Sequence, residues 1–172
     1  LEGSIQTSGD RLRTTVRLLR VSDGSTLWAG TFDEQLTGVF AVQDAISQRV
    51  VAALALELTD AQRRLLTRHD TGDSEAYQLY LKGRFFWNKR SRDGFERGAA
   101  YFRQAVEKDP VYARAYAGLA DSYIGMTYYH YVAPRAAMPL ARAAALKALE
   151  IDDSLAEAHV SLAHVKTNYD WD

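Results

Sequence analysis

The feature that most constrains the fold of this 172-residue chain is a stretch of seventeen residues that occurs twice. Segments 104–120 and 147–163 are identical at seven of seventeen positions. Each copy has Ala-x-Glu-x-Asp before a corner, then Ala-x-Ala and Leu-Ala after it. Small residues at these spacings suit two helices that meet closely at a tight corner. Such a repeat predicts a helical array whose units bury their apolar faces against one another.

The repeated segment resembles the tetratricopeptide repeat, or TPR, family. In that family each unit is an antiparallel pair of helices, and stacked pairs form a superhelix with a concave ligand-binding surface. The resemblance rests on the sequence Ala-Val-Glu-Lys-Asp-Pro at 105–110 and on the pattern Phe102, Tyr116, Leu119, Ala120 and Tyr123.

Two departures from the TPR pattern stand out. The usual period is about 34 residues, whereas Ala105 and its counterpart Ala148 are 43 residues apart. We expect the extra residues between the helices of the middle unit, around 127–134. Asp153 stands where the family usually has proline.

Composition narrows the function classes. The net charge is −1, so the chain has no overall attraction to nucleic acid or to an anionic membrane. It has no cysteine, which excludes disulfides and thiolate metal sites. The chain begins with Leu1 rather than Met and ends just after a helix that lacks a partner, so we expect a piece of a longer protein.

The amino-terminal third has the two-residue period of β-strands. Charged and apolar residues alternate from Arg11 to Leu18, which predicts a strand with one wet face and one buried face. Asp23-Gly24 is a hairpin signal because glycine accepts a positive φ. We expect three antiparallel strands, at about 1–7, 11–21 and 26–33.

Helical spacing follows the strands. Apolar residues from Val39 to Leu54 predict one long helix, at about 38–58. Thr59 and Gln62 have the spacing of a capping box, which predicts a short helix at about 60–67. The polar stretch 69–73 is the expected linker.

The first segment resembles the end of a TolB-like amino-terminal domain. The resemblance rests on Leu1-Glu2-Gly3-Ser4, Leu27-Trp28-Ala29 and 39–44, and it continues through 77–88. It implies a TolB-like α/β part over 1–68, as in bacterial signalling proteins that carry a kinase, an adenylate cyclase or a winged-helix regulator upstream. Only the last strands and helix of that domain are present here.

The remaining residues, 74–172, are expected to form TPR-like repeats. We place one helix pair at about 74–89 and 92–108, a second at 111–129 and 136–151, and a lone third-unit helix at 154–168. The predicted fold class is therefore α+β, mainly α. A unit that cannot bury its face alone needs a neighbour. The unpaired last helix and the incomplete β segment are the two candidate contacts for a homodimer.

Residues that could support catalysis are sparse. His159 and His164 are five apart, so they lie on different faces of a helix. We expect His159 in an interface and His164 in solvent or a groove. His130 lies in an aromatic run that packing explains, and the repeat explains Asp152-Asp153 as turn residues. We expect no catalysis, cofactor or metal in this fragment, although a longer parent protein can carry a kinase or cyclase domain.

A basic and aromatic stretch at 82–103 suggests an alternative function. Cations interleaved with rings can bind single-stranded nucleic acid or another anionic ligand. The simpler interpretation is a solvated helix face whose rings pack inward on Tyr101 and Phe102. The stretch contains Lys82, Arg84, Phe85, Phe86, Trp87, Lys89, Arg90, Arg92, Arg97 and Arg103.

The TPR resemblance implies a groove along the first helix of each pair. There the arginines would pair with carboxylates of a bound, acidic protein or peptide, while aromatic residues supply contact area. The function expected is a non-catalytic interaction scaffold or sensory module of a bacterial signalling protein. The compartment stays open between the cytoplasm and the outer side of a membrane-anchored parent. The groove residues expected are Tyr80, Arg84, Trp87, Arg114, Asp121 and His164.

Overall fold

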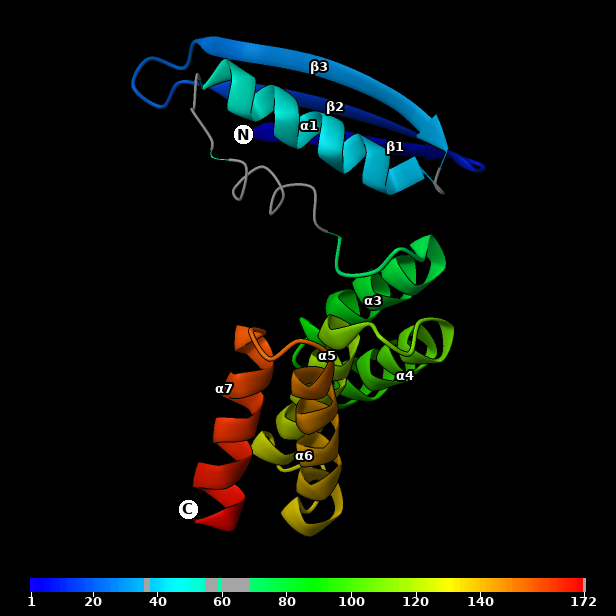
Figure 1. The fold of residues 1–172 in the computed structure, drawn as a ribbon, viewed down its shortest axis with the longest axis vertical. Helices are drawn as coiled ribbons and strands as arrows, with labels where there is room; N and C mark the ends of the chain where they lie inside the picture. The colour runs from blue at the N-terminus through cyan, green and yellow to red at the C-terminus, as the bar shows by residue number, and fades with distance from the viewer. Residues whose placement is uncertain (36–37, 55–58, 60–68, 172) are drawn as a thin grey trace. The chain divides into compact units, whose positions relative to one another are not determined.

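A computed structural model describes residues 1–35, 38–54, 59 and 69–171. The chain separates into two units, 1–69 and 70–172, and each is described by itself (Figure 1). The first holds a three-stranded antiparallel sheet and a helix, and the second is helical. The predicted α+β, mainly α class is therefore confirmed.

The sheet has the strand order β1-β2-β3, from β1 (Glu2–Ser8), β2 (Arg11–Leu19) and β3 (Thr26–Gln35). Both neighbouring pairs are antiparallel. Gly9 and Gly24 have positive φ values of 62° and 71° in the two connecting turns, where other residues would be strained. At the second turn the backbone N–H of Ser25 donates to Asp23 Oδ1 at 2.9 Å.

Alternation along β2 separates the two faces of the sheet. Leu12, Val16 and Leu18 are buried, whereas the arginines between them are exposed. Helix α1 (Val39–Ala53) contacts β3, and its Val42 is buried. The helix expected at about 38–58 is thus described as far as Ala53, and the short helix expected at 60–67 lies outside the described residues.

The second unit consists of consecutive helices joined by short turns. Helix α3 packs on α4 and α5 packs on α6, while α4 also contacts α5. The helices are α3 (Ser74–Trp87), α4 (Arg92–Lys108), α5 (Ala113–Tyr128), α6 (Pro134–Ile151) and α7 (Ala156–Val165), followed by a π-helical turn (Lys166–Asp170).

The two copies of the repeated corner are built alike. Asp109 Oδ1 accepts a hydrogen bond from the backbone N–H of Val111 at 3.1 Å. Asp152 Oδ1 accepts one from the backbone N–H of Ser154 at the same distance. Each aspartate satisfies a backbone group that the corner would leave free. The interpretation of Asp152 as a turn residue is confirmed.

Close approach of the helices in the core depends on glycines that face aromatic rings. A methyl group added at Gly83 of α3 or Gly118 of α5 would lie 2.6 Å from the ring of Phe102. At Gly125 it would lie 2.5 Å from the ring of Phe95. Both phenylalanines are fully buried on α4, so α4 fits its rings against the backbones of its neighbours.

The longer repeat period is not explained by a long connection. Helix α5 ends at Tyr128 and α6 begins at Pro134, so only 129–133 lie between them. The backbone N–H groups of Tyr131 and Val132 both donate to Met126 O, at 2.8 and 3.2 Å. Helices α5 and α6 are 16 and 18 residues long, so most of the residues between the two repeated corners are helical.

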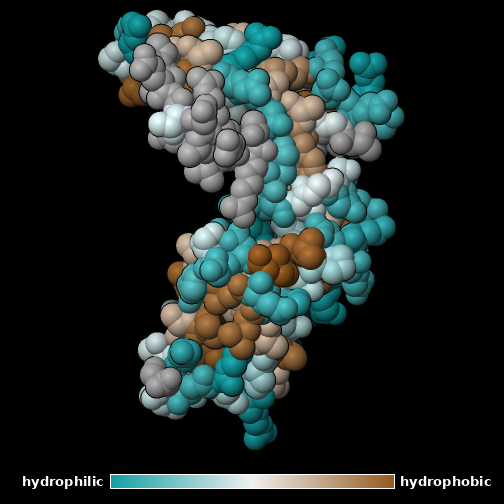
Figure 2. All heavy atoms as spheres, viewed as in Figure 1, coloured by the Kyte–Doolittle hydropathy of each residue, from teal (hydrophilic) through white to brown (hydrophobic). Residues whose placement is uncertain are grey.

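The last helix is shorter than the expected range 154–168. Regular α7 ends at Val165, and in the π-helical turn beyond it Tyr169 packs against the cluster that contains Met138 and Val165. Val160 on α7 is 68% exposed. Figure 2 shows apolar surface in the second unit, in the region where α6 and α7 lie side by side. A dimer contact through this helix stays a prediction.

Candidate functional site

The candidate site is the surface shared by the first helix of each successive pair. Helix α5 contacts both α3 and α7, so side chains of all three can meet. We call this surface the α3–α5–α7 face. It is defined by Tyr80, Arg84, Trp87, Arg90, Arg114, Asp121, Glu157 and Ser161.

Tyr80 lies between the core and this face. Its ring centroid is 5.6 Å from that of Phe102 and 5.3 Å from that of Tyr112. Burial raises the pKa of Tyr80, while the positive charges of Arg84 and Arg114 oppose the rise. The ring is thus a packing element, and its phenol lies within the electric field of the two arginines.

Asp121 of α5 interacts with one residue of α7 and one residue of α3. Its Oδ1 accepts a hydrogen bond from Ser161 Oγ of α7 at 2.7 Å. Its Oδ2 is 3.9 Å from Arg84 Nη1 of α3, which is an ion pair but not a hydrogen bond. Burial raises the pKa of Asp121, and the hydrogen bond from Ser161 and the charge of Arg84 oppose the rise.

The guanidinium groups of two arginines lie over the ring of Trp87. The Cζ atoms of Arg84 and Arg90 lie 4.8 and 3.8 Å from its ring centroid, which is cation–π geometry. Arg90 has a positive φ of 51° in the turn after α3, and its N–H donates to Trp87 O at 3.2 Å. Among the described residues Arg90 makes no ion pair.

Arg84 and Arg90 lie near carboxylates, but neither is hydrogen-bonded to one among the described residues. Arg84 and Arg90 both act on Asp121, lowering its pKa against the effect of burial. Arg84 donates no hydrogen bond to Asp121, because the contact between them exceeds hydrogen-bond distance. Two oriented guanidinium groups whose N–H donors are not taken up by Asp121 can donate to a carboxylate or phosphate oxygen of a ligand.

Arg114 is held differently. Its Nε is 3.2 Å from Asp70 Oδ2, so the cation already has an acidic partner. This pair lies near Tyr80, because both charges influence the pKa of that phenol. Arg114 therefore offers less free positive charge to a ligand than Arg90 does.

His164 is half-buried on α7, one turn beyond Ser161. Its backbone carbonyl accepts a hydrogen bond from Asn168 Nδ2 at 3.0 Å. No hydrogen bond or ion pair among the described side chains joins its ring to Asp121 or the arginines. The structure thus groups five of the six expected residues and leaves His164 at the margin.

Sequence reasoning missed Arg90 and Ser161 as parts of this face, and Asp70 as the ion-pair partner of Arg114. Arg90 lies just beyond α3, and only its left-handed backbone returns the side chain over Trp87. Ser161 corresponds to Gly118 in the repeat, so the repeat pattern gave it no special weight. Asp70 falls in the expected linker. The only signal available was the pair of basic residues Lys89-Arg90.

His159 differs from its expected position in an interface. It is exposed, and its Nε2 lies 2.7 Å from the backbone oxygen of Asp153. The ring of His159 therefore binds the backbone of the corner that precedes α7. This correction follows from the first turn of α7, where position 159 faces away from α5 and α6.

The basic aromatic stretch forms a second surface, on α3 and α4. Lys89 Nζ is 4.8 Å from the ring centroids of both Phe85 and Phe86, and Arg97 Cζ is 3.9 Å from that of Phe86. Phe86 also stacks on Tyr101 at 5.4 Å. The expected inward packing holds for Phe86 but not for Phe85, which is 61% exposed.

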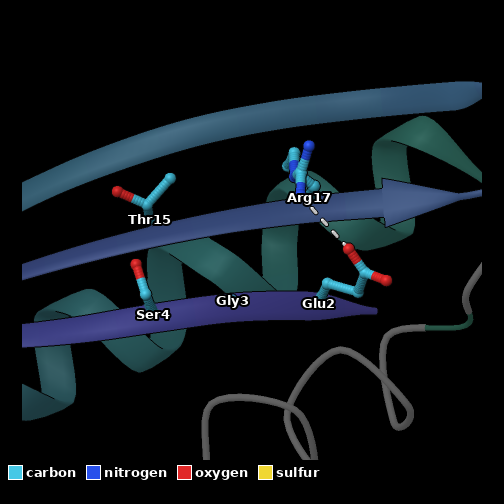
Figure 3. A pocket seen from close by; sticks show the side chains of 5 residues that line it. All are labelled: Glu2, Gly3, Ser4, Thr15 and Arg17. Carbon is cyan, nitrogen blue, oxygen red and sulfur yellow. Dashed lines mark hydrogen bonds and ion pairs between the residues drawn. The ribbon is translucent and has the colours of Figure 1, made fainter.

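The outer face of the sheet carries a hollow of about 540 Å³ (Figure 3). It is lined by Glu2, Gly3, Ser4, Thr15 and Arg17. Arg17 Nη2 is bound to Glu2 Oε2 at 3.2 Å, so the two charges of the hollow neutralise each other.

Within the described ranges, no group of three metal-ligating side chains occurs. In the same part of the chain, no helix has both the length and the apolar character needed to cross a bilayer.

The chain is similar to part of a longer known protein. No family model matches the chain. A protein of Rhizobium meliloti (strain 1021) named "Putative adenylate cyclase 3" is 29% identical over 120 residues. The match covers 70% of this chain and 20% of the relative, so the chain corresponds to about a fifth of that protein. The TPR and TolB-like resemblances stay predictions.

Proposed function

We propose that the chain is a non-catalytic interaction module of a bacterial signalling protein, and that its α3–α5–α7 face binds an acidic protein segment. The observation that carries this proposal is the pair of guanidinium groups, Arg84 and Arg90, held on the ring of Trp87. The similarity to part of a protein named as an adenylate cyclase supports the signalling context.

The geometry favours a carboxylate ligand for three reasons. The two guanidinium groups are oriented by one indole ring, which lowers the entropy lost when they bind. Arg90 has no acidic partner among the described residues, so no internal ion pair must break. At this end of the face neither Arg84 nor Arg90 is hydrogen-bonded to a carboxylate among the described residues, although the carboxylates of Asp121 and Glu157 both lie nearby.

The rest of the face suits a peptide rather than a small anion. Tyr80 and Trp87 present rigid, half-buried rings, and Val160 of α7 adds exposed apolar surface. Aromatic residues and arginine are the side chains that most often dominate binding energy at interfaces. A segment with an acidic residue near an apolar or aromatic one would match these features.

The test is selection of peptides from a random display library on the 172-residue chain, followed by calorimetry with one selected peptide. We expect enrichment of Asp and Glu. The Arg90→Gln variant should bind the peptide about tenfold more weakly, which corresponds to the loss of one charge-assisted contact. Arg103→Gln is the matched control because Arg103 is an exposed arginine on α4.

A variant with the opposite effect makes the test specific. Asp121→Asn removes the carboxylate that competes with the ligand for Arg84. We therefore expect this variant to bind the selected peptide several-fold more tightly than the parent chain. Equal binding by the Arg90→Gln variant and the parent, or selection of basic peptides, would contradict the proposal.

Nucleic-acid binding by the stretch 82–103 has less support. Base stacking needs open ring faces, and the Phe86 ring is occupied by Tyr101 and Arg97. Phe85 is the exposed ring there, and it contacts Lys89. Binding of a single-stranded oligonucleotide that weakens steeply with salt would favour this alternative.

A further inference from the structure

Strand β1 is an edge strand with an open side. It pairs with β2 in an unbroken register from Glu2 opposite Arg17 to Ser8 opposite Arg11, and with no other described strand. All seven of its residues are exposed. Its outward N–H and C=O groups therefore form a template for another strand.

The apolar side of the sheet continues to this edge without cover. Ile5 lies opposite Thr14 and on the same face as Val16, since paired residues of antiparallel strands share a face. Thr14 and Val16 are buried, yet Ile5 is 68% exposed. Ile5 is thus exposed beside a strand edge that has no partner among the described strands.

Lysine, proline and bulges, three protections of an edge strand, are absent from β1. The segment Glu-Gly-Ser-Ile-Gln-Thr-Ser has no lysine and no proline, and its pairing with β2 has no bulge. Natural proteins use such features to prevent pairing between edges. An edge of this length without them is suited to pairing.

The order of residues in β1 indicates what pairs with it. In an antiparallel pairing of two copies centred on Ile5, Glu2 lies opposite Ser8 of the second copy, and Ile5 lies opposite Ile5. The register opposes no like charges. It also places Glu2 between its own Arg17 and, across Ser8, Arg11 of the second copy. Apolar and polar faces of the two sheets coincide.

We propose that β1 pairs antiparallel with β1 of a second copy about a two-fold axis at Ile5, joining two sheets into one of six strands. The contact is isologous and closed, so it yields a dimer rather than a fibre. It is separate from the α3–α5–α7 face, which lies in the other unit.

The chain has no cysteine, so single cysteines report this contact cleanly. In the 172-residue chain, Ile5→Cys should cross-link to a covalent dimer under mild oxidation or with a short bis-maleimide, because directly opposed side chains are about 5 Å apart. Ser8→Cys is the matched control on the same strand. Its two copies would be roughly 20 Å apart, six residues along the strand direction.

Sedimentation of the unmodified chain provides the second measurement. We expect a concentration-dependent species of twice the 19.3 kDa chain mass. Ile5→Lys should weaken the dimer about tenfold or more, because it places two like charges opposite each other and removes the apolar pair. Ile5 is exposed, so circular dichroism of the variant should match that of the parent.

Each result has a defined consequence. Cross-linking of Ile5→Cys without cross-linking of Ser8→Cys supports the proposed register. Equal cross-linking at both positions, or a parent chain that sediments as a monomer at all concentrations, overturns it. A dimer that Ile5→Lys leaves intact overturns it as well, and would locate the contact elsewhere.

Discussion

Asp121 shows how one residue serves both stability and the candidate site. Its carboxylate is held by Ser161 and lies near Arg84, but burial still raises its pKa above the ordinary value. The folded chain therefore binds this proton more readily than the unfolded chain does. The cost of the buried charge is fully present above the folded-state pKa and is lost as the pH falls through it.

The replacement Asp121→Asn tests this sign. We expect the variant to be at least as stable as the parent at neutral pH, with a difference in unfolding free energy that shrinks as the pH falls through the acidic range. The change can be no steeper than about 1.4 kcal/mol per pH unit, the limit for one proton. Urea unfolding at several pH values measures it. A variant that is less stable at neutral pH would show that Arg84 and Ser161 outweigh burial.

At the scale of elements, the close contact of α4 with α3 and α5 depends on glycines facing Phe102. Gly118→Ala should lower the free energy of unfolding by about 1–3 kcal/mol, because the added methyl group would lie 2.6 Å from that ring. Gly72→Ala is the control, since nothing lies within 4 Å of its added methyl group. A Gly118→Ala variant as stable as the control would contradict this packing.

The elements were largely predictable because their periods are strong. Three sequence features each indicated a local structure that the protein has: the alternation in β2, the Asp-Gly turn and the repeated corners. The predictions that failed depended on details of the backbone that no periodic residue pattern indicates. The link after α5 is short because Tyr131 and Val132 fold back onto Met126 O, and no residue pattern signals that bond.

The site followed from the sequence only in part, for a related reason. The TPR resemblance implied a groove that contains Tyr80, Arg84 and Asp121, and the structure brings these three residues together. Arg90 reaches Trp87 through a left-handed residue that is not glycine, which sequence rules treat as uncommon. Arg90, the cation with no described ion-pair partner on which the proposed function depends, was therefore the one that the resemblance did not indicate.

At the scale of the whole molecule, each unit carries one proposed contact. The sheet unit offers the β1 edge, and the helical unit offers the α3–α5–α7 face. The two proposals can be separated, because Ile5→Lys should weaken the pairing of β1 without changing peptide affinity, and Arg90→Gln should weaken peptide binding without changing the pairing. This independence fits a scaffold that recognises one partner while it associates with another.

The most direct measurement is an amide NMR titration of the 172-residue chain with an acidic peptide from the display selection. The account predicts shifts that concentrate on α3, α5 and α7 around Arg84, Trp87, Arg90 and Asp121, together with a shift of the Trp87 indole N–H. Shifts confined to α4 and α6 or to the sheet, or no shifts at all, would contradict it.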